Sequence, residues 1–180
     1  GEDNHHPSHQ QQRIVIQNNL SDDVNRDVWG GAGRAFPLIA PAKPSLKVKI
    51  DHNTATTAGN AFLVMGDSVV VSLGARFTNN IVIKGDYGAF GSGKGEGTGA
   101  LSFFMPDAVF ANNAIVGALA GSYPTGNHFP ATVAAVGFKD AAAGDSSLLA
   151  PSSYKGKGSD GKDLGADMAG LTAAIAGVVK

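Results

Sequence analysis

Three short stretches of this sequence carry residue types that could do chemistry. The first, GAFGSGKGEGTG at residues 88–99, matches the spacing of a nucleotide-binding P-loop through Gly88, Gly93 and Lys94. The last position of a P-loop needs a Ser or Thr hydroxyl for Mg²⁺, and here it is Gly95. A P-loop also needs a following helix, and GEGTGALSFF is poor in helix formers. We therefore predict a glycine-rich loop between strands, with Lys94 as a solvated charge.

The second stretch is the loop SDDVNRDVWGGAGRAF at residues 21–36. Its three aspartates offer the oxygen ligands that Ca²⁺ prefers, and they are the candidate metal residues: Asp22, Asp23 and Asp27. The candidate carbohydrate-binding residues are an aromatic side chain that could stack on a sugar ring and its two cationic neighbours: Trp29, Arg26 and Arg34. The alternative is a solvated loop in which an arginine pairs with an aspartate and Trp29 packs on the protein.

Histidines form the third group. His52 lies in the sequence DHN, at a position where the other copies of a repeat carry asparagine, so we expect it to replace an amide at a bend of the chain. His5, His6 and His9 lie in a polar run that could bind a metal adventitiously or form a polar loop. No catalytic set is complete, and the catalytic residues are left unassigned.

An asparagine-containing repeat organises the chain around these stretches. IQNNL, IDHNT, FTNNI and FANNA share a large apolar residue, any residue, Asn or His, and then Asn. Asparagine tolerates the left-handed backbone of a sharp bend, and stacked copies can bond their side-chain amides along the stack. We therefore predict a solenoid with a structural ladder of asparagines spaced by 34, 27 and 33 residues: Asn19, Asn53, Asn80 and Asn113.

Strand-forming segments fill the space between these bends. RIVIQ and KVKID precede two of the asparagine motifs, and four further β-rich segments are candidate strands: AFLVM from Ala61, SVVVSL from Ser68, LSFFM from Leu101 and ATVAAVGF from Ala131. Residues 168–178 form an amphipathic pattern behind Asp167, a predicted N-cap. We expect this short helix to cap the solenoid or to fold back on its side as a lid.

Composition limits the classes of partner. The 180 residues suit one domain, and the net charge of −1 gives no electrostatic footprint for nucleic acid. Apolar runs are too short and interrupted for a membrane span. Cysteine is absent, which excludes disulfides and thiolate metal sites without deciding the compartment. The 25 glycines indicate a chain rich in turns.

Together these segments resemble the C-terminal portion of bacterial right-handed parallel β-helix repeat proteins of the pectate-lyase-like superfamily. The resemblance is carried by RIVIQNNLSDDV, WGGAGRAF, VKIDHNT, FTNNI, FPATVAAVGF and above all the tail LLAPSSYKGKGSDGKDLGAD. It implies an all-β, right-handed parallel β-helix, here of about four to six rungs with a short C-terminal helix. It also implies a bacterial secreted or cell-surface protein.

Two function classes follow from this resemblance. The first is a non-catalytic extracellular scaffold, structural, adhesive or carbohydrate-associated. The alternative is the C-terminal part of a polysaccharide lyase or glycoside hydrolase. We expect no cofactor for the scaffold, and for the enzyme the resemblance implies that Ca²⁺ is possible.

We expect one β-helix domain over 1–180, with a polar lead-in at 1–12, rungs at 13–150 and a turn segment and helix at 151–180. The expected partners are a polysaccharide and, through an uncapped N-terminal end of the solenoid, further copies in an oligomer or filament.

Overall fold

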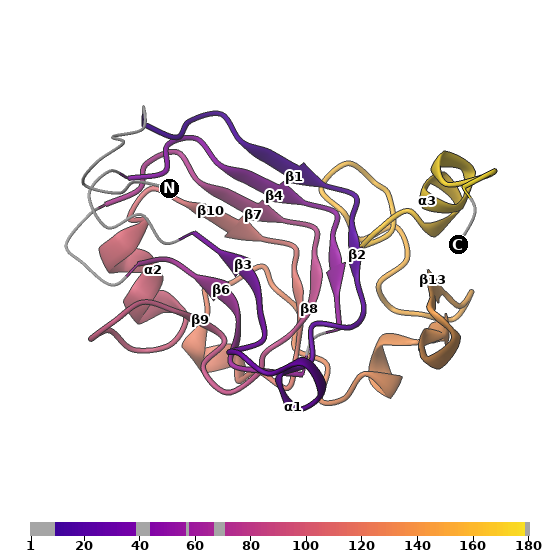
Figure 1. Cartoon of the computed structure of the whole chain (residues 1–180). Helices are drawn as coiled ribbons and strands as arrows, with labels where there is room; N and C mark the ends of the chain where they lie inside the picture. The colour runs from indigo at the N-terminus through magenta and orange to yellow at the C-terminus, as the bar shows by residue number, and fades with distance from the viewer. Residues whose placement is uncertain (1–9, 39–43, 57, 67–70, 179–180) are drawn as a thin grey trace.

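Short parallel strands dominate the computed structural model, which describes residues 10–38, 44–56, 58–66 and 71–178 (Figure 1). Eleven strands form three parallel sheets. The first sheet contains β1 (Val15–Gln17), β4 (Lys49–Asp51), β7 (Arg76–Thr78) and β10 (Val109–Ala111). The second contains β2 (Leu20–Ser21), β5 (Thr54–Ala55), β8 (Ile81–Ile83) and β11 (Ala114–Val116). The third contains β3 (Arg34–Pro37), β6 (Ala61–Val64) and β9 (Ala89–Phe90).

The chain visits these sheets in turn, which makes the architecture a solenoid-like repeat. Each passage through the first, second and third sheets is one rung, and the described residues form three complete rungs and a fourth that lacks its third strand. Neighbouring rungs are in strict register in the first sheet, where Ile16, Ile50, Phe77 and Phe110 are stacked partners. The predicted β-rich, parallel arrangement is therefore confirmed.

The core lies between the three sheets. Ile50, Phe77 and Phe110 are buried, and the rings of Phe77 and Phe110 stack at 5.1 Å between centroids. Tyr123 adds a further buried ring beside Phe110, and burial raises the pKa of its hydroxyl. That hydroxyl donates to Glu96 at 2.8 Å and accepts from the Ala89 N–H, so its polar end is satisfied.

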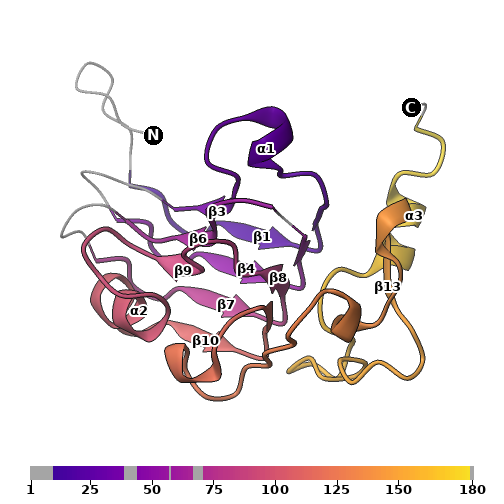
Figure 2. The ribbon, with the colours of Figure 1, turned by 90° about the horizontal axis from the view of Figure 1, so that it is seen from below.

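A C-terminal region covers the outward face of the second sheet (Figure 2). Ile81 and Val116 of this sheet form a second apolar cluster with Val136 and Leu164. Strands β8 and β11 are therefore covered on both faces of the sheet, which explains why both are continuously apolar. The region contains the antiparallel strands β12 (Phe138–Asp140) and β13 (Asp145–Leu148), three-residue 3₁₀ helices at Ala134–Val136 and Ala141–Ala143, and α3 (Met168–Ala174). A further 3₁₀ helix, Ala120–Ser122, follows β11.

Two predicted strands are wrong. The segment from Leu101 belongs to the helix α2 (Thr98–Phe104), which buries Ala100, Leu101 and Phe104 on one face. This spacing of one and three residues is helical, although the aromatic residues favour strands when considered singly. The segment from Ala131 forms turns and the 3₁₀ helix Ala134–Val136, and strand β12 begins only at Phe138.

The remaining element predictions have mixed outcomes. AFLVM is confirmed as β6. Residues 68–70 of SVVVSL lie outside the described residues, and Val71–Leu73 are not in a strand. Helix α3 begins behind the predicted N-cap, since Asp167 accepts from the Gly170 N–H at 3.0 Å. The helix ends at Ala174, four residues earlier than predicted, and Ile175 and Val178 of the expected apolar face lie beyond it, 55% and 68% exposed.

Within the part of the chain that the structure describes, no helix is both long and apolar enough to cross a membrane.

Candidate functional site

One bend of the chain concentrates most of the buried polar side chains. It joins the first sheet to the second, and in every rung it places one residue in the left-handed region: Asn18, His52, Asn79 and Asn112, with φ of 54°, 50°, 58° and 55°. Asparagine and histidine tolerate this conformation better than most side chains do. The name Asn corner is used below for these four residues together with the asparagine that follows each of them.

The predicted asparagine ladder is present at the Asn corner. Asn53 donates its backbone N–H and its side-chain amide N–H to the side-chain Oδ1 of Asn80, at 2.9 and 3.0 Å. Asn19 makes the same pair of bonds to Asn53, and Asn80 makes them to Asn113. Asn80 and Asn113 are fully buried. The ladder therefore satisfies the polar groups that the bend takes out of water.

A fifth member of the ladder was missed by sequence reasoning. Asn113 donates to the side-chain Oδ1 of Asn127 with its backbone and side-chain N–H groups, both at 3.0 Å. Gly126 precedes Asn127 with φ of 81° and takes the left-handed position. Gly-Asn is thus equivalent to Asn-Asn at this bend, and that equivalence was the signal that could have found it.

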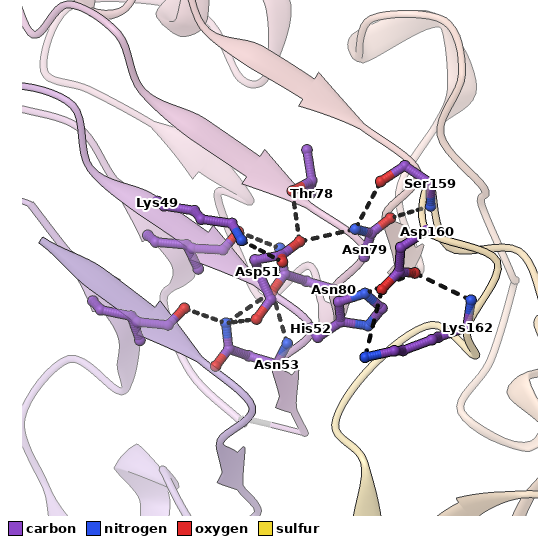
Figure 3. A network of polar contacts seen from close by, with 12 residues as sticks. Lys49, Asp51, His52, Asn53, Thr78, Asn79, Asn80, Ser159, Asp160 and Lys162 are labelled. Carbon is purple, nitrogen blue, oxygen red and sulfur yellow. Dashed lines mark hydrogen bonds and ion pairs between the residues drawn. The ribbon is translucent and has the colours of Figure 1, made fainter. Parts of the chain in front are cut away.

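A carboxylate holds the Asn corner to the first sheet (Figure 3). Asp51 accepts from the Thr78 hydroxyl at 2.7 Å and the Asn79 amide at 2.8 Å, and lies 3.0 Å from the Lys49 ammonium. Burial acts to raise the pKa of Asp51, but hydrogen bonds from Thr78, Lys49 and Asn79 leave that pKa below its ordinary value. Asp51 is therefore an ionised structural group, not a proton donor.

The C-terminal region docks on the same corner. Asn79 and Ser159 are joined by two hydrogen bonds, one to the Ser159 hydroxyl and one from its backbone N–H (Figure 3). His52 lies between the Gly165 carbonyl and the Asp160 carboxylate, at 3.3 Å from each. Asn18 accepts from the Asp167 N–H at 2.7 Å. The left-handed residues of three rungs thus bind the chain's own C-terminal segment.

A cleft of about 520 Å³ opens beside this junction, between the Asn corner, β13 and residues 155–169. Lys155 and Asp163 pair across 2.6 Å on its wall, and Asp163 also accepts from the Gly156 N–H. Burial acts to raise the pKa of Asp163, but Lys155 and that N–H leave it lowered. A general acid at neutral pH needs a raised carboxyl pKa, and Asp163 has the opposite shift.

The predicted carbohydrate-binding residues lie around a second surface, formed by the short helix α1 (Arg26–Trp29) and the third sheet. Arg26 pairs with Asp86, which is 60 residues further along the chain. Trp29 is 69% exposed at the end of α1, and Tyr87, adjacent to Asp86, is 54% exposed. The guanidinium carbon of Arg34 lies 6.0 Å from the centre of the Phe90 ring.

This grouping, called the α1 surface below, consists of Arg26, Trp29, Arg34, Asp86 and Tyr87. Sequence reasoning found three of the five. Asp86 and Tyr87 were missed because only the stacking of rungs brings residues 86–87 beside α1. The Arg26 N–H donates to the Ala58 carbonyl, and the Asp86 N–H donates to the adjacent Gly59 carbonyl. The site thus contains two exposed aromatic side chains and one arginine–carboxylate pair.

The three candidate calcium ligands do not gather. Asp22 and Asp23 are exposed residues after β2, whereas Asp27 lies in α1 with a carboxylate oxygen 3.6 Å from the Arg26 Nε. Among the described residues, no three His, Asp or Glu side chains are grouped as a metal site requires. His5, His6 and His9 lie outside the described residues.

The P-loop-like stretch has a different surrounding from the one expected. Strand β9 lies within it and helix α2 begins at its end, so the prediction of a loop between strands is wrong, and a missing helix is not a valid argument against nucleotide binding. Lys94, however, lies over the Phe103 ring at 3.9 Å. Its ammonium is engaged in a cation–π contact, and Gly95 still lacks the hydroxyl for Mg²⁺.

No family model, curated protein or solved structure matches this chain.

Proposed function

We propose that this chain belongs to a right-handed parallel β-helix of the pectate-lyase-like kind and serves as a non-catalytic, carbohydrate-associated scaffold outside a bacterial cell. Three observations support the fold part of the proposal. The chain repeats its three strands in order, the rungs are in register, and a buried asparagine ladder follows one bend. The tail that carries the sequence resemblance packs against these rungs.

The α1 surface is the observation that carries the functional part. Exposed aromatic rings cost free energy in water, and paired with planar hydrogen-bonding groups they suit the apolar faces and hydroxyls of sugars. Trp29 and Tyr87 supply the rings, and Arg26 with Asp86 supplies donors and acceptors. The Arg26–Asp86 ion pair joins α1 to the turn before β9, so Trp29 and Tyr87 project from two elements that are tied to each other.

The absence of a catalytic role is supported by how the titratable groups are used. Asp51 and Asp163 are both held ionised by intramolecular partners. His52 lies between Gly165 and Asp160 at the docked C-terminal region. These groups stabilise the junction between the rungs and the tail, and none is left as a matched acid and base.

The test is a screen of neutral and acidic polysaccharides that reports binding and unsaturated product absorbance together, with and without Ca²⁺. We expect binding without cleavage, and a loss of about tenfold in affinity for Trp29→Ala, the size expected for one stacked ring. Leu119→Ala is the matched control, because Leu119 is an exposed apolar residue after β11. Formation of unsaturated product would replace the proposal by the alternative, a polysaccharide lyase.

Assembly through the first rung is a second part of the proposal. Strand β1 is the outermost strand of its sheet among the described residues, and Asn19 ends the ladder on that side. A further copy could add to this edge by strand pairing. Sedimentation of the chain over a range of concentrations tests it, and a monomer at every concentration would contradict it.

A further inference from the structure

Residues 158–167, called the C-terminal strap below, cross the Asn corner one rung at a time. Three residues of the strap each bond to the left-handed residue of one rung, in reverse rung order: Ser159 to Asn79, Gly165 to His52 and Asp167 to Asn18. The third and first rungs present amides, which do not titrate. The second rung presents an imidazole, which ordinarily gains a proton near pH ~6.5. The strap therefore has a titratable contact in the middle of its path.

Glycines allow the strap to approach this imidazole closely. A Cβ atom at Gly158 would lie 3.1 Å from the His52 Cε1 and 2.7 Å from the Asp160 Oδ1. A Cβ atom at Gly165 would lie 2.9 Å from the Ile81 Cδ1, and Gly165 has φ of 81°. His52 itself is only 7% exposed. The strap is thus built to fit around the His52 ring and against the second sheet.

Both ring nitrogens of His52 face oxygen acceptors. Nδ1 lies 3.3 Å from the Gly165 carbonyl oxygen, which can only accept, so Nδ1 carries a proton. Nε2 lies 3.3 Å from the Asp160 carboxylate, and it is a buried atom with no aligned hydrogen-bond partner among the described residues (Figure 3). A neutral ring would turn a lone pair toward this carboxylate, whereas imidazolium turns an N–H toward it. The docked geometry therefore suits the protonated ring.

The charges around the ring also favour a cation there. Four carboxylates and three ammonium groups lie next to His52, line its cleft or pair with such a residue: Asp51, Asp160, Asp163, Asp167, Lys49, Lys155 and Lys162. One negative charge is left over when all seven groups are ionised. Burial acts to raise the pKa of Asp160, but the Lys162 N–H and the nearby His52 charge leave that pKa lowered. Asp160 therefore remains a carboxylate in mild acid.

We propose that protonation of His52 fastens the C-terminal strap to the rungs, so that mildly acidic surroundings hold the strap more tightly than alkaline ones. The added stability is present below pH ~6.5 and is lost as the pH rises through the range in which the imidazole loses its proton. Asp51 and Asp160 keep their charges in this range. The proposal goes beyond the proposed function and does not rest on carbohydrate binding.

His128 is the other histidine among the described residues, and its effect has the opposite sign. Burial lowers the pKa of His128, and Lys157 lowers it further. Its ring lies edge-on to the Tyr154 ring, with 5.6 Å between centroids. Protonation of His128 should therefore weaken its surroundings as the pH falls. A strap that becomes tighter on acidification points to His52 and not to His128.

The test is amide hydrogen exchange of the full chain at about pH 5.5 and about pH 8, on either side of the ordinary imidazole range. Mass spectrometry reads the protection of each peptide relative to the unstructured chain at the same pH. We expect peptides of residues 158–167 to be about fivefold better protected at the lower pH. Peptides of β12 and β13 in the same digest are the internal reference and should change by less than about twofold.

Two variants should remove this pH dependence. His52→Asn gives the second rung the residue that the other rungs use, and an amide does not titrate. Asp160→Asn can donate a hydrogen bond to the neutral Nε2, so the strap should be equally protected at both pH values. The asparagine ladder does not use Asp160 and should stay intact in this variant. His128→Asn is the matched control and should keep or increase the pH dependence of the strap.

Equal protection of the wild-type strap at both pH values would overturn the proposal. A pH dependence that persists in either His52→Asn or Asp160→Asn would do the same, as would its loss in His128→Asn. Polysaccharide is absent from these measurements, so failure of the α1 surface to bind sugars does not affect the result.

Discussion

Both ends of the first sheet need a residue with a left-handed backbone, but they use different kinds of side chain there. Where the strands end, the left-handed positions of the Asn corner hold asparagine and histidine, and in the first three rungs their side chains bond to other parts of the chain. Where the strands begin, Arg13 and Lys47 take the same conformation and no described carboxylate pairs with them. The difference separates polar residues that hydrogen-bond within the fold from cations that have no carboxylate partner among the described residues.

Breaking the ladder should have the largest effect. Asn80→Ala removes the acceptor of the Asn53 backbone N–H and the donor to the Ile50 carbonyl, both buried. We expect a loss of about 3 kcal/mol in the free energy of unfolding, measured by chemical denaturation. Asn19→Ala is the matched control, because Asn19 is exposed at the edge of the ladder and should lose under 1 kcal/mol. Equal losses would mean that the ladder is not the main stabilising feature of the corner.

Acid should weaken the Asn corner by protonating Asp51. The folded-state pKa of Asp51 lies below its unfolded value, so this carboxylate stabilises the fold above pH ~4 and ceases to do so as the pH falls through the folded pKa. We expect Asp51→Asn to cost about 1–2 kcal/mol at pH 7.

The same substitution should also reduce the further loss of stability on acidification, followed by thermal unfolding across the acid range. Asp22→Asn, an exposed carboxylate outside the network, should leave the acid dependence unchanged. An identical acid profile for wild type and Asp51→Asn would contradict the role given to Asp51.

The smallest effect should be an increase in the free energy of unfolding when Lys47 is replaced by glycine. Lys47→Gly relieves the left-handed strain at φ of 53°, and part of this gain is offset by the greater freedom of glycine in the unfolded chain. We expect an increase of about 0.5–1 kcal/mol in the free energy of unfolding. Lys47→Ala keeps a Cβ atom in the strained conformation and should not stabilise. A gain in both variants would mean that the lysine side chain, not the backbone, is the unfavourable element.

Sequence reasoning succeeded where one residue type, asparagine, is enough to stabilise a bend of the chain. The repeated Asn after a left-handed residue predicted the ladder at Asn19, Asn53, Asn80 and Asn113, and the strand before each bend followed from alternation. It failed at Leu101 and Ala131, where tertiary packing decides the local structure. Buried Ala100, Leu101 and Phe104 make α2 stable although its aromatic residues favour strands.

The candidate site was predicted only in part, because its members come from distant rungs. Arg26, Trp29 and Arg34 belong to one loop and were found together, whereas Asp86 reaches Arg26 only through the stacking of rungs. The cations at the other end of the first sheet likewise come from different rungs. Lys47 and Lys49 are adjacent in sequence, but their relation to Arg13 and Arg76 depends on the register of three strands.

The most direct test of the difference between the two ends compares the free energies of unfolding of Asn79→Gly and Lys47→Gly, measured by chemical denaturation. Both substitutions place glycine at a left-handed position. Asn79→Gly also removes hydrogen bonds to Asp51 and Ser159, whereas no described carboxylate pairs with Lys47. We expect Asn79→Gly to lower the free energy of unfolding and Lys47→Gly to raise it. A loss of stability in both variants would contradict the assignment of the two ends.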